Sequence, residues 1–431
     1  MKAYILAGGF GSRLVEVTKN LVPKPMAKIA GVPLLERAVL NLKENGIKEF
    51  FISVSHMSEK ITEYFGNGEK FGVKITYIFE DTPLGSGGAL YYLKGKVNGD
   101  FIVCSADTVF DIDVFRMHAY HKRKKAVATL FTHPNLHPYD SDIVQTDRYG
   151  KVTGFMLKNG VRNDYYKNNV NAGFIILNSK ALEDLKAPTK MNLEHDFISG
   201  LIDGGERVYA YKSAEYIKDA GTPERFYAVE SEILSGKVSA RNYKNKQKAI
   251  FLDRDGTLNV YKGFINSHEQ IELEKGVIEG VRKINQSGYL AIIISNQPVI
   301  ARGEATRADV EKTFDKIQTL LGKEGAFIDG IYYCPHHPHK GFRGEVKRLK
   351  KECDCRKPKI GMIERAVKDF NLDLSKCCII GDSEIDVLTG INAKIPQIQL
   401  KRGIAEGQKT EPTYVAEDFS TAVEYAIGER K

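Results

Sequence analysis

Two aspartates separated by one residue follow an apolar run in the second half of the chain. Asp253 and Asp255 come directly after Ala249–Leu252 and precede Gly256, which permits a sharp turn. In an extended chain, residues i and i+2 point to the same side, so both carboxylates should face one point. Paired carboxylates can hold Mg²⁺, and one can attack phosphorus while the other moves a proton. The spacing therefore predicts a site for phosphate chemistry.

Two later apolar runs end in groups that suit the same site. Ser295 and Asn296 end one run, and their side chains can hydrogen-bond a phosphoryl oxygen. Asp382 ends another run and can complete a metal site, with Asp386 one helical turn later. A single Asp-x-Asp pair is weak evidence, because it is most often a turn or a solvated pair. Three apolar runs that end in such residues, in this order along the chain, are strong evidence for a phosphate site.

A cluster of cysteine and histidine has the spacing of a metal site. Four soft or borderline ligands with no open position suit a structural Zn²⁺. Arg356 and Lys357 follow the last cysteine directly, so a bound metal would order the loop that aims these cations at a phosphoryl group. Free thiols in a mobile loop are the alternative. The candidate ligands are Cys334, Cys353 and Cys355, with His336, His337 and His339 competing for the nitrogen position.

A glycine-rich turn follows the first apolar run of the chain. Gly8, Gly9 and Gly11 would let backbone N–H groups approach phosphates, and the start of the following helix favours anions. Arg13 can pair with a triphosphate, and Lys24 brings a second cation close to the first. A glycine-rich turn alone is a weak signal, but these two cations make a nucleotide site the preferred interpretation.

Both candidate sites require strands that end at them. Strands alternating with helices predict an α/β fold with mostly parallel sheets and right-handed crossovers. Helical spacing over 34–45 predicts a helix in the first half. The apolar runs predict strands over 4–6, 49–54, 100–104, 249–253, 290–295 and 378–382.

The chain of 431 residues is long enough for two or three domains. Residues 237–247 contain no acidic residue and little apolar content, which is typical of a solvated linker. An exposed helix end is the alternative for this stretch. We therefore expect two α/β domains, over 1–236 and 248–431.

The composition excludes several classes of protein. Hydrophobic residues make up 42% and charged residues 27%, as in globular proteins, and no apolar run approaches the ~20 residues of a membrane span. The apolar stretch at the start is too short for a signal peptide. The net charge of +8 is dispersed, which favours phosphorylated small molecules over nucleic acid. Six sparse cysteines indicate a reducing, cytoplasmic location, with Cys104, Cys377 and Cys378 in the core.

The second half resembles the haloacid-dehalogenase-like phosphatases, and most closely those that act on D-glycero-D-manno-heptose 1,7-bisphosphate. The resemblance implies that Asp253 is the nucleophile that becomes aspartyl-phosphate and that Asp255 is the general acid and base. The chain departs from the family pattern at Pro298–Val299, where the family has Ser-Gly. The motifs that carry the resemblance are Asp253–Asn259, Ser295–Gly303, Cys334–Pro338, Cys353–Met362 and Gly381–Asp382.

The same resemblance implies roles for other residues. Ser295 and Lys357 would steady the phosphoryl group, and Arg356 and the loop around Asn296 would contact the substrate. Family spacing favours His336 as the nitrogen ligand of the zinc. Mg²⁺ would be held by the Asp382 and Asp253 carboxylates and the Asp255 backbone carbonyl.

The first half resembles the sugar-1-phosphate nucleotidyltransferases, and most closely the heptose-1-phosphate guanylyltransferases. In such enzymes the sugar phosphate attacks the α-phosphorus in line and pyrophosphate leaves, so catalysis consists of positioning and charge neutralisation. Arg13 and Lys24 would then stabilise the triphosphate, and Asp107 and Asp219 would hold Mg²⁺. The motifs are Gly8–Leu14, Pro23–Pro25, Pro83–Ala89, Ser105–Thr108, Val170–Gly173, Leu193–Glu194 and Asp219–Pro223.

The nucleotidyltransferase resemblance also implies residues that bind substrate. Gly85 lies in the turn that would hold base and ribose, and Lys158 would hold the sugar phosphate. The chain departs from the family at Ala106, where the family has glycine, and at Leu157, where it has glutamate. The residues that would meet sugar hydroxyls are Asn171, Gly173 and Glu194.

Together the two resemblances imply a bifunctional enzyme. A Rossmann-like mixed-sheet nucleotidyltransferase domain would precede a Rossmann-like phosphatase domain, with phosphosugars and a nucleoside triphosphate as partners and neither nucleic acid nor membrane. The phosphatase would make heptose 1-phosphate, and the transferase would couple it to GTP, giving GDP-heptose for lipopolysaccharide or S-layer glycans. Guanine would pair with the α anomer. The alternatives are a transferase for mannose or glucose 1-phosphate, and a histidinol-phosphate or polynucleotide-end phosphatase with a regulatory nucleotide-binding domain.

Overall fold

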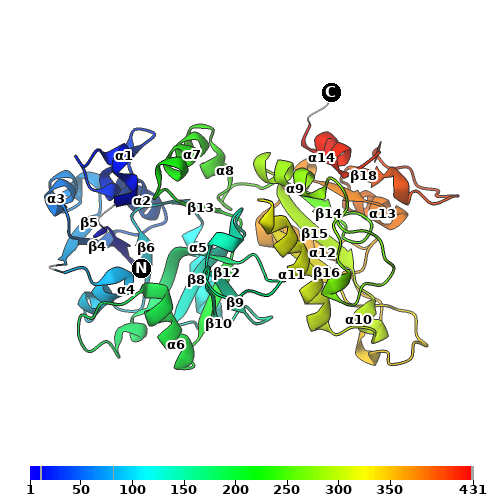
Figure 1. Ribbon diagram of the computed structural model, residues 1–431, viewed down its shortest axis with the longest axis horizontal. Helices are drawn as coiled ribbons and strands as arrows, with labels where there is room; N and C mark the ends of the chain where they lie inside the picture. Colours follow the sequence, from blue (N-terminus) through cyan, green and yellow to red (C-terminus); the bar gives the residue numbers. More distant parts are fainter. Residues whose placement is uncertain (10–11, 81, 429–431) are drawn as a thin grey trace. The chain divides into compact units, whose positions relative to one another are not determined.

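The chain folds into two compact units, shown in Figure 1. The structure is a computed structural model, and it describes residues 1–9, 12–80 and 82–428. The first unit comprises residues 1–133, 144–156 and 171–242. The second unit comprises residues 134–143, 157–170 and 243–431. Two segments from the first half of the sequence thus belong to the second unit, which the sequence patterns do not indicate.

A mixed sheet forms the centre of the first unit, as predicted. The parallel strands β1, β4 and β6 lie side by side, with Ile5 opposite both Ile52 and Cys104. Strand β11 runs antiparallel to β6, which makes the sheet mixed. The main strand order is β10 (Val152–Met156), β9 (Ile143–Thr146), β11 (Val170–Asn178), β6 (Asp100–Ser105), β1 (Lys2–Leu6), β4 (Glu49–Val54) and β5 (Lys74–Phe79), with β8 (Ala128–His133) joining β11 to β12 (Val208–Lys212).

Apolar side chains cover both faces of this sheet. On one face Ile5 of β1 packs with Leu35 and Val39 of helix α2, and on the other face Tyr4 packs with Val103. Neighbouring residues of a strand point to opposite faces, so a strand buried on both faces is apolar throughout. The helix predicted over 34–45 is confirmed as α2. The longer helices of the unit are α2 (Leu34–Glu44), α3 (Ser58–Phe65), α5 (Val114–Lys124) and α7 (Pro223–Leu234).

An all-parallel sheet forms the centre of the second unit. Strand β14 is central and fully buried, and its Leu252 lies opposite Ile293 on one side and Ile380 on the other. Because the strands are parallel, their carboxyl ends meet at one edge of the sheet. The strand order is β16 (Gly330–Cys334), β15 (Leu290–Asn296), β14 (Ala249–Leu252), β17 (Cys378–Gly381), β18 (Gln397–Leu400) and β19 (Tyr414–Ala416).

Helices cover this sheet and begin close to its carboxyl edge. Helix α13 starts directly after the turn that follows β17 and is capped by Ser383. Its first turn therefore brings Asp386 to the end of the sheet. The longer helices are α9 (Val277–Gln286), α11 (Arg307–Lys323), α12 (Gly361–Phe370), α13 (Glu384–Ala393) and α14 (Phe419–Ile427).

The segment predicted as a solvated linker is partly ordered and buried. It starts with the short helix α8 (Lys237–Ala240). The Asn242 amide donates a hydrogen bond to Asp111 Oδ1 at 2.6 Å in the first unit. The Tyr243 ring lies edge-to-face against Phe370 in the second unit, with 6.1 Å between ring centroids. Composition did not reveal this burial, because polar side chains here find partners far away in the sequence.

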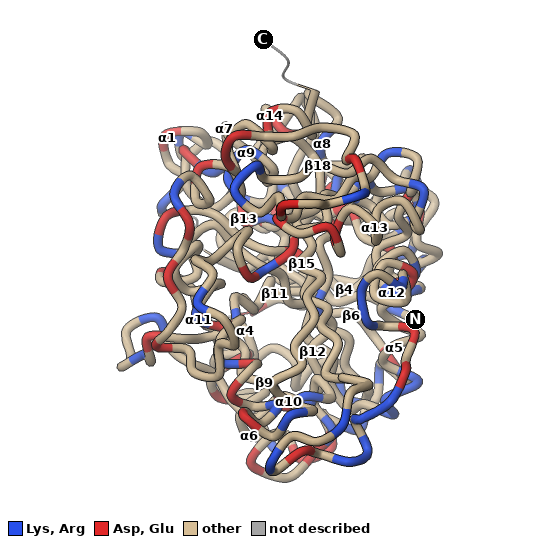
Figure 2. The backbone as a smooth tube through the Cα atoms, turned by 90° about the vertical axis from the view of Figure 1, so that its right-hand side faces the viewer, with Lys and Arg blue, Asp and Glu red and all other residues tan. Residues whose placement is uncertain are grey.

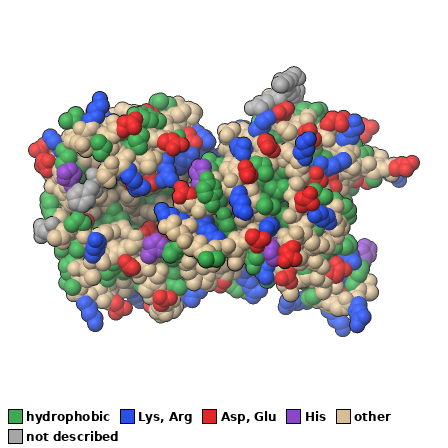
Figure 3. All heavy atoms as spheres, viewed as in Figure 1, with side chains coloured by type: hydrophobic (Ala, Val, Ile, Leu, Met, Phe, Trp, Pro, Cys, Tyr) green, Lys and Arg blue, Asp and Glu red, His purple; other side chains and the backbone are tan. Residues whose placement is uncertain are grey.

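Charged residues are interspersed along the backbone of both units (Figure 2) and over the face shown in Figure 3. Among the described residues, no helix combines the length and the apolar character that crossing a membrane requires. Cys104, Cys377 and Cys378 are buried, as predicted.

We expect the contact between α9 and α14 to be sensitive to one added methyl group. A Cβ atom at Gly280 would lie 2.6 Å from the Phe419 ring, so Gly280→Ala should lower the free energy of unfolding by about 1–3 kcal/mol. Urea unfolding followed by circular dichroism measures this loss. Gly200→Ala is the control, because its Cβ would meet nothing within 4 Å. Equal effects of the two substitutions would contradict the packing argument.

Candidate functional site

Three carboxylates converge at the carboxyl edge of the second sheet. Asp253 follows β14, Asp382 follows β17, and Asp386 lies in the first turn of α13, with one oxygen of each within 4.8 Å of the others. Their approach requires Gly256, which has φ +82 and whose Cβ would lie 2.1 Å from Asp382 Oδ2. The sequence predicted only that Asp386 lies one helical turn after Asp382, and the structure places its carboxylate in the same group.

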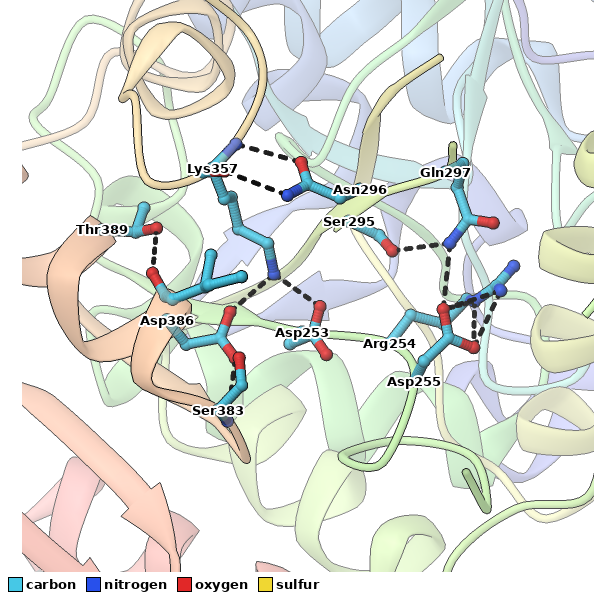
Figure 4. A network of polar contacts seen from close by, with 11 residues as sticks. Asp253, Arg254, Asp255, Ser295, Asn296, Gln297, Lys357, Ser383, Asp386 and Thr389 are labelled. Carbon is cyan, nitrogen blue, oxygen red and sulfur yellow. Dashed lines mark hydrogen bonds and ion pairs between the residues drawn. The ribbon is translucent and has the colours of Figure 1, made fainter. Parts of the chain in front are cut away.

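The Lys357 ammonium lies between two of these carboxylates (Figure 4). Its Nζ is 2.5 Å from Asp253 Oδ1 and 2.6 Å from Asp386 Oδ1. Burial alone would lower the pKa of Lys357, but the two carboxylates outweigh it and raise that pKa. Burial raises the pKa of Asp253 to about 8, against the opposing attraction of Lys357. Burial likewise raises the pKa of Asp382 to about 6.

The excess of buried negative charge fits a bound divalent cation. Asp253, Asp382 and Asp386 offer three carboxylates at one point, while Lys357 supplies one positive charge. Mg²⁺ takes oxygen ligands and is usually held by a few carboxylates together with substrate phosphate. These residues therefore fit Mg²⁺. The role predicted for the Asp255 backbone carbonyl stays a prediction.

The side chains of Asp255 and Asp253 have different hydrogen-bond partners. The Arg254 guanidinium donates to both Asp255 oxygens at 2.8–3.0 Å, and Gln297 Nε2 donates to Oδ2 at 3.0 Å. Arg254 is 1% exposed and also donates to Thr313 Oγ1 at 2.8 Å. A bidentate guanidinium fixes the carboxylate in one orientation. Sequence reasoning missed Arg254 and Gln297, although a charge inside a buried strand end was a visible signal for Arg254.

Ser295 and Asn296 have different surroundings. Ser295 Oγ accepts a hydrogen bond from Gln297 Nε2 at 2.8 Å, which leaves its own proton for another acceptor. The Asn296 amide is used at both ends by the Lys357 backbone: Oδ1 accepts from Lys357 N at 3.0 Å and Nδ2 donates to Lys357 O at 3.1 Å. Asn296 thus clamps the segment that carries Lys357, and its contact with substrate stays a prediction.

A cluster of cysteine and histidine side chains includes Cys355, which is two residues before Lys357 of the carboxylate site in the sequence. The four ligand atoms lie within 4.8 Å of one another, with Cys334 Sγ 3.5 Å from Cys353 Sγ and His336 Nδ1 3.3 Å from Cys355 Sγ. Such separations suit a tetrahedral ion with Zn–S bonds of about 2.3 Å, so these residues fit a structural Zn²⁺. Of the competing histidines, only His336 belongs to this group among the described residues.

Arg356 is tied to the same cluster. Its Nη1 donates to the His336 backbone carbonyl at 3.2 Å, and Lys357 follows it directly. His337 Nδ1 instead donates to the His339 carbonyl at 3.3 Å. A bound metal at Cys355 would therefore hold the backbone that aims both cations.

Removing one ligand of this cluster should separate metal binding from general packing. We expect the unmodified protein to hold about one equivalent of zinc per chain at this site and Cys353→Ala to lose it, with a fall in melting temperature of about 5 °C or more. Elemental analysis and thermal unfolding measure both effects. Cys378→Ala is the control, because Cys378 is a buried cysteine of the same unit outside the cluster. Retention of zinc by Cys353→Ala would contradict the assignment.

The first unit contains a cavity of about 270 Å³ at the carboxyl end of its central strands. Gly9 lies in its wall. Gly8 precedes it in the same turn, with its carbonyl accepting from Ser55 Oγ at 3.2 Å, and Gly11 lies outside the described residues. The helix after this turn is only a 3-10 turn (Ser12–Leu14) and α1 (Val15–Thr18), so its dipole is weaker than the sequence suggested. The cavity is lined by Leu6, Ala7, Gly9, Ser12, Arg13, Lys24, Pro25, Ser105, Ala106 and Asp107.

Opposite charges meet in this cavity. Lys24 Nζ forms an ion pair with Asp107. Burial would raise the pKa of this carboxyl, but the attraction of Lys24 and the hydrogen bonds from Lys24 and Ser105 together outweigh burial and lower that pKa. Arg13 is exposed at the wall of the cavity. Strands β7 (Thr108–Asp111) and β13 (Tyr216–Asp219) pair so that Asp219 lies opposite Thr108, next to Asp107. Asp107, in the turn before β7, and Asp219, at the end of β13, fit Mg²⁺, with nucleotide phosphates as the remaining ligands.

The remaining predicted residues of the nucleotide site fall into three places. Gly85 has φ +73, and its Cβ would lie 2.5 Å from the Met191 carbonyl, so only glycine fits this turn. Asn171 Nδ2 donates to Glu194 Oε1 at 3.2 Å, and Gly173 lies on the same strand as Asn171. Lys158 belongs to the segment 157–170 of the second unit, where its backbone N–H donates to Asp142 Oδ1 at 2.9 Å.

Comparisons with known proteins give two families for the two parts of the chain. Residues 2–236 match the nucleotidyl transferase family, and residues 354–422 match the HAD-hydrolase-like family. The D-glycero-beta-D-manno-heptose-1,7-bisphosphate 7-phosphatase of Pasteurella multocida is 38% identical over 177 residues, which cover 40% of this chain and 94% of that protein. The Escherichia coli K12 protein of the same name is 37% identical over 147 residues, covering 34% and 75%.

Each part of the chain is also similar to solved structures. HddC from Yersinia pseudotuberculosis, complexed with GMP-PN, is 25% identical and covers 54% of this chain and 99% of its own, with a TM-score of 0.46. The D,D-heptose 1.7-bisphosphate phosphatase from B. bronchiseptica, complexed with magnesium and phosphate, is 27% identical and covers 43% and 99%, with a TM-score of 0.37.

Proposed function

Since this chain belongs to the nucleotidyl transferase family and, in its C-terminal part, to the heptose-1,7-bisphosphate 7-phosphatases, we propose that it catalyses two consecutive steps of nucleotide-heptose synthesis. The phosphatase removes the 7-phosphate of the bisphosphate. The transferase then couples heptose 1-phosphate to GTP and releases pyrophosphate. The observation that carries this proposal is one chain with two phosphate sites, of which one converges on Asp253 and the other on Asp107. The product of the first site is the substrate of the second.

The phosphatase step follows from the carboxylate site. Asp253 Oδ attacks phosphorus, an aspartyl-phosphate bond forms, and the bond from phosphorus to the C7 oxygen breaks. Asp255 gives its proton to that oxygen and then takes a proton from the water that hydrolyses the intermediate, which releases phosphate. Lys357 offsets charge on the transferring group. Asp253, Asp382 and Asp386 would hold Mg²⁺, which supplies further charge neutralisation.

The transfer step follows from the cavity of the first unit. An oxygen of the sugar phosphate attacks the α-phosphorus of the nucleotide, and the bond to pyrophosphate breaks. Arg13 and Lys24 neutralise the triphosphate, and Asn171 and Glu194 bind sugar hydroxyls. Lys158 binds the sugar phosphate. Asp107 and Asp219 would hold Mg²⁺, which adds charge neutralisation at the phosphates.

Two versions of this function differ in the anomer of the heptose phosphate that the enzyme uses. GTP as the nucleotide goes with the α anomer of the heptose phosphate. The curated relatives are named for the β anomer, which supports a second candidate: the β anomer coupled to another nucleotide. Leu157 stands where the family has a glutamate, so the identity of the sugar is open at this position. Mannose 1-phosphate and glucose 1-phosphate are therefore further acceptors to test. The relatives' names weigh against a histidinol-phosphate or polynucleotide-end phosphatase.

A one-pot reaction tests the proposed sequence of steps. We expect purified protein with Mg²⁺, the α bisphosphate and a panel of nucleoside triphosphates to give GDP-heptose, read by mass. The same pot with the β bisphosphate is the matched control. A nucleotide sugar formed only from the β anomer would support the second candidate. Heptose 1-phosphate without any nucleotide sugar would contradict the transferase assignment, and hexose 1-phosphates added to the same pot would identify another acceptor.

Substitutions at the two sites should act separately. Asp253→Asn removes the nucleophile and should lower phosphate release to below about one thousandth, while transfer from added heptose 1-phosphate persists. Asp107→Ala should abolish transfer and leave phosphate release unchanged. Coupled assays of phosphate and pyrophosphate measure both reactions. Loss of both activities in either variant would contradict two independent catalytic sites.

A further inference from the structure

Arg402 contacts the backbone of the turn that follows Asp255. It lies in the short 3-10 turn Lys401–Gly403, directly after strand β18 at the carboxyl edge of the second sheet. Its Nη2 and Nε both donate to the Gly256 carbonyl, at 2.7 and 3.3 Å. The Gly256 N–H donates to the Asn259 carbonyl at 2.8 Å, so both backbone polar groups of this glycine have partners. Arg402 therefore fixes the turn from the side of β18.

The residue after Arg402 contacts a second loop of the carboxylate site. A Cβ at Gly403 would overlap the Asp382 carbonyl oxygen, so only glycine fits at this position. The same oxygen accepts a hydrogen bond from Gln399 Nε2 at 3.1 Å, and Gln399 is 0% exposed. Two neighbouring residues, Arg402 and Gly403, thus contact the backbone of the loop after β14 and of the loop after β17.

An acid holds the other side of the Arg402 guanidinium. Its Nη1 lies 3.2 Å from Glu274 Oε2, and the Glu274 N–H donates to the Leu258 carbonyl at 3.0 Å. Glu274 is therefore fixed by the same turn that Arg402 contacts. A planar guanidinium can bind Glu274 and the Gly256 carbonyl at once, whereas a lysine ammonium is a single flexible point charge.

The carboxylates of this site need such support because they repel one another. One oxygen each of Asp253, Asp382 and Asp386 lies within 4.8 Å of the others, and like charges at this separation favour moving apart until a cation binds. The turn is pressed against one of them, since a Cβ at Gly256 would overlap Asp382 Oδ2. Ligands that are already held in place bind a metal more tightly, because less conformational freedom is lost on binding.

We propose that Arg402 is a positioning residue for the phosphatase reaction: through the Gly256 carbonyl it holds the turn after Asp255 against Asp382 and so keeps the metal-binding carboxylates together. This inference rests on the phosphatase step of the proposed function, which uses Mg²⁺ at these carboxylates. All residues of the argument belong to the second unit. Arg402 acts on the reaction through the turn and not through contact with the substrate.

The Mg²⁺ dependence of phosphate release by the full chain tests this role. Arg402→Met and Arg402→Lys should each raise the Mg²⁺ concentration for half-maximal release about three-fold or more, as expected for loss of one partly exposed hydrogen bond. Arg402→Lys keeps the charge and loses the two-sided contact, so it should not rescue the Mg²⁺ dependence. Saturating Mg²⁺ should restore most of kcat, because the metal then holds the carboxylates together.

Lys401→Met is the matched control. It removes a positive charge from the neighbouring residue, whose Nζ pairs with Glu417 at 2.6 Å, and both side chains of this pair are mostly exposed. Exposed ion pairs contribute little to stability. Lys401→Met should therefore leave the Mg²⁺ dependence of phosphate release unchanged.

Hydrogen exchange of the full chain measures the turn without any catalysis. The backbone N–H groups of residues 256–259 all donate hydrogen bonds within the turn. Without Mg²⁺ they should exchange faster in Arg402→Met than in Lys401→Met, because the Gly256 carbonyl has lost its partner. Added Mg²⁺ should reduce this difference.

Several results would overturn the proposal. An unchanged Mg²⁺ dependence in both Arg402 variants would do so, and a change in Arg402→Met alone would show that only charge matters. A raised KM for the heptose bisphosphate at saturating Mg²⁺ would show that Arg402 contacts substrate instead. Equal exchange of residues 256–259 in Arg402→Met and Lys401→Met would show that Arg402 does not hold the turn. Absence of Mg²⁺-dependent phosphate release in the unmodified chain would instead contradict the proposed function, and hydrogen exchange would still test the contact.

Discussion

The ammonium of Lys357 between Asp253 and Asp386 is the interaction on which the phosphatase site depends. A buried carboxylate is costly unless an opposite charge or a metal compensates it, and removing one partner of such a pair leaves an unpaired buried charge. Two other constraints hold Lys357 in place. The Asn296 amide clamps its backbone, and the preceding residues enter the cysteine and histidine cluster. A loop far from β14 in sequence is thereby held against the end of that strand.

The two catalytic sites balance charge in different ways. In the second unit, carboxylates outnumber the buried ammonium, so a cation and a transferable phosphoryl group complete the site. In the first unit, Lys24 pairs with Asp107 beside an open cavity. A triphosphate entering this cavity competes with Asp107 for Lys24, and a metal bound to Asp107 removes that competition. Under the proposed function, nucleotide binding and metal binding would be coupled through this ion pair.

Much of the fold could be predicted from the sequence, because apolar runs and helical spacing are local signals. Strands β14, β15 and β17, which end at Leu252, Asn296 and Gly381, match the predicted runs to within one residue. Spacing also identified the cysteines of the metal cluster. The roles of Gln297 and Arg254 could not be predicted, because they depend on contacts between distant segments. Gln297 bridges Ser295 to Asp255, and Arg254 donates to Thr313 on helix α11. The segment 157–170 is the clearest example, because nothing in its sequence indicates that it belongs to the second unit.

The close fit of Pro138 against Gly322 constrains how such a fusion can be recombined. A crossover in the segment 237–247 would join residues 134–143 and 157–170 from one parent to helix α11 from another. Such a hybrid would bring together two surfaces that were never matched, even though both catalytic centres were inherited intact. These two segments and α11, more than 130 codons apart, must therefore be exchanged together.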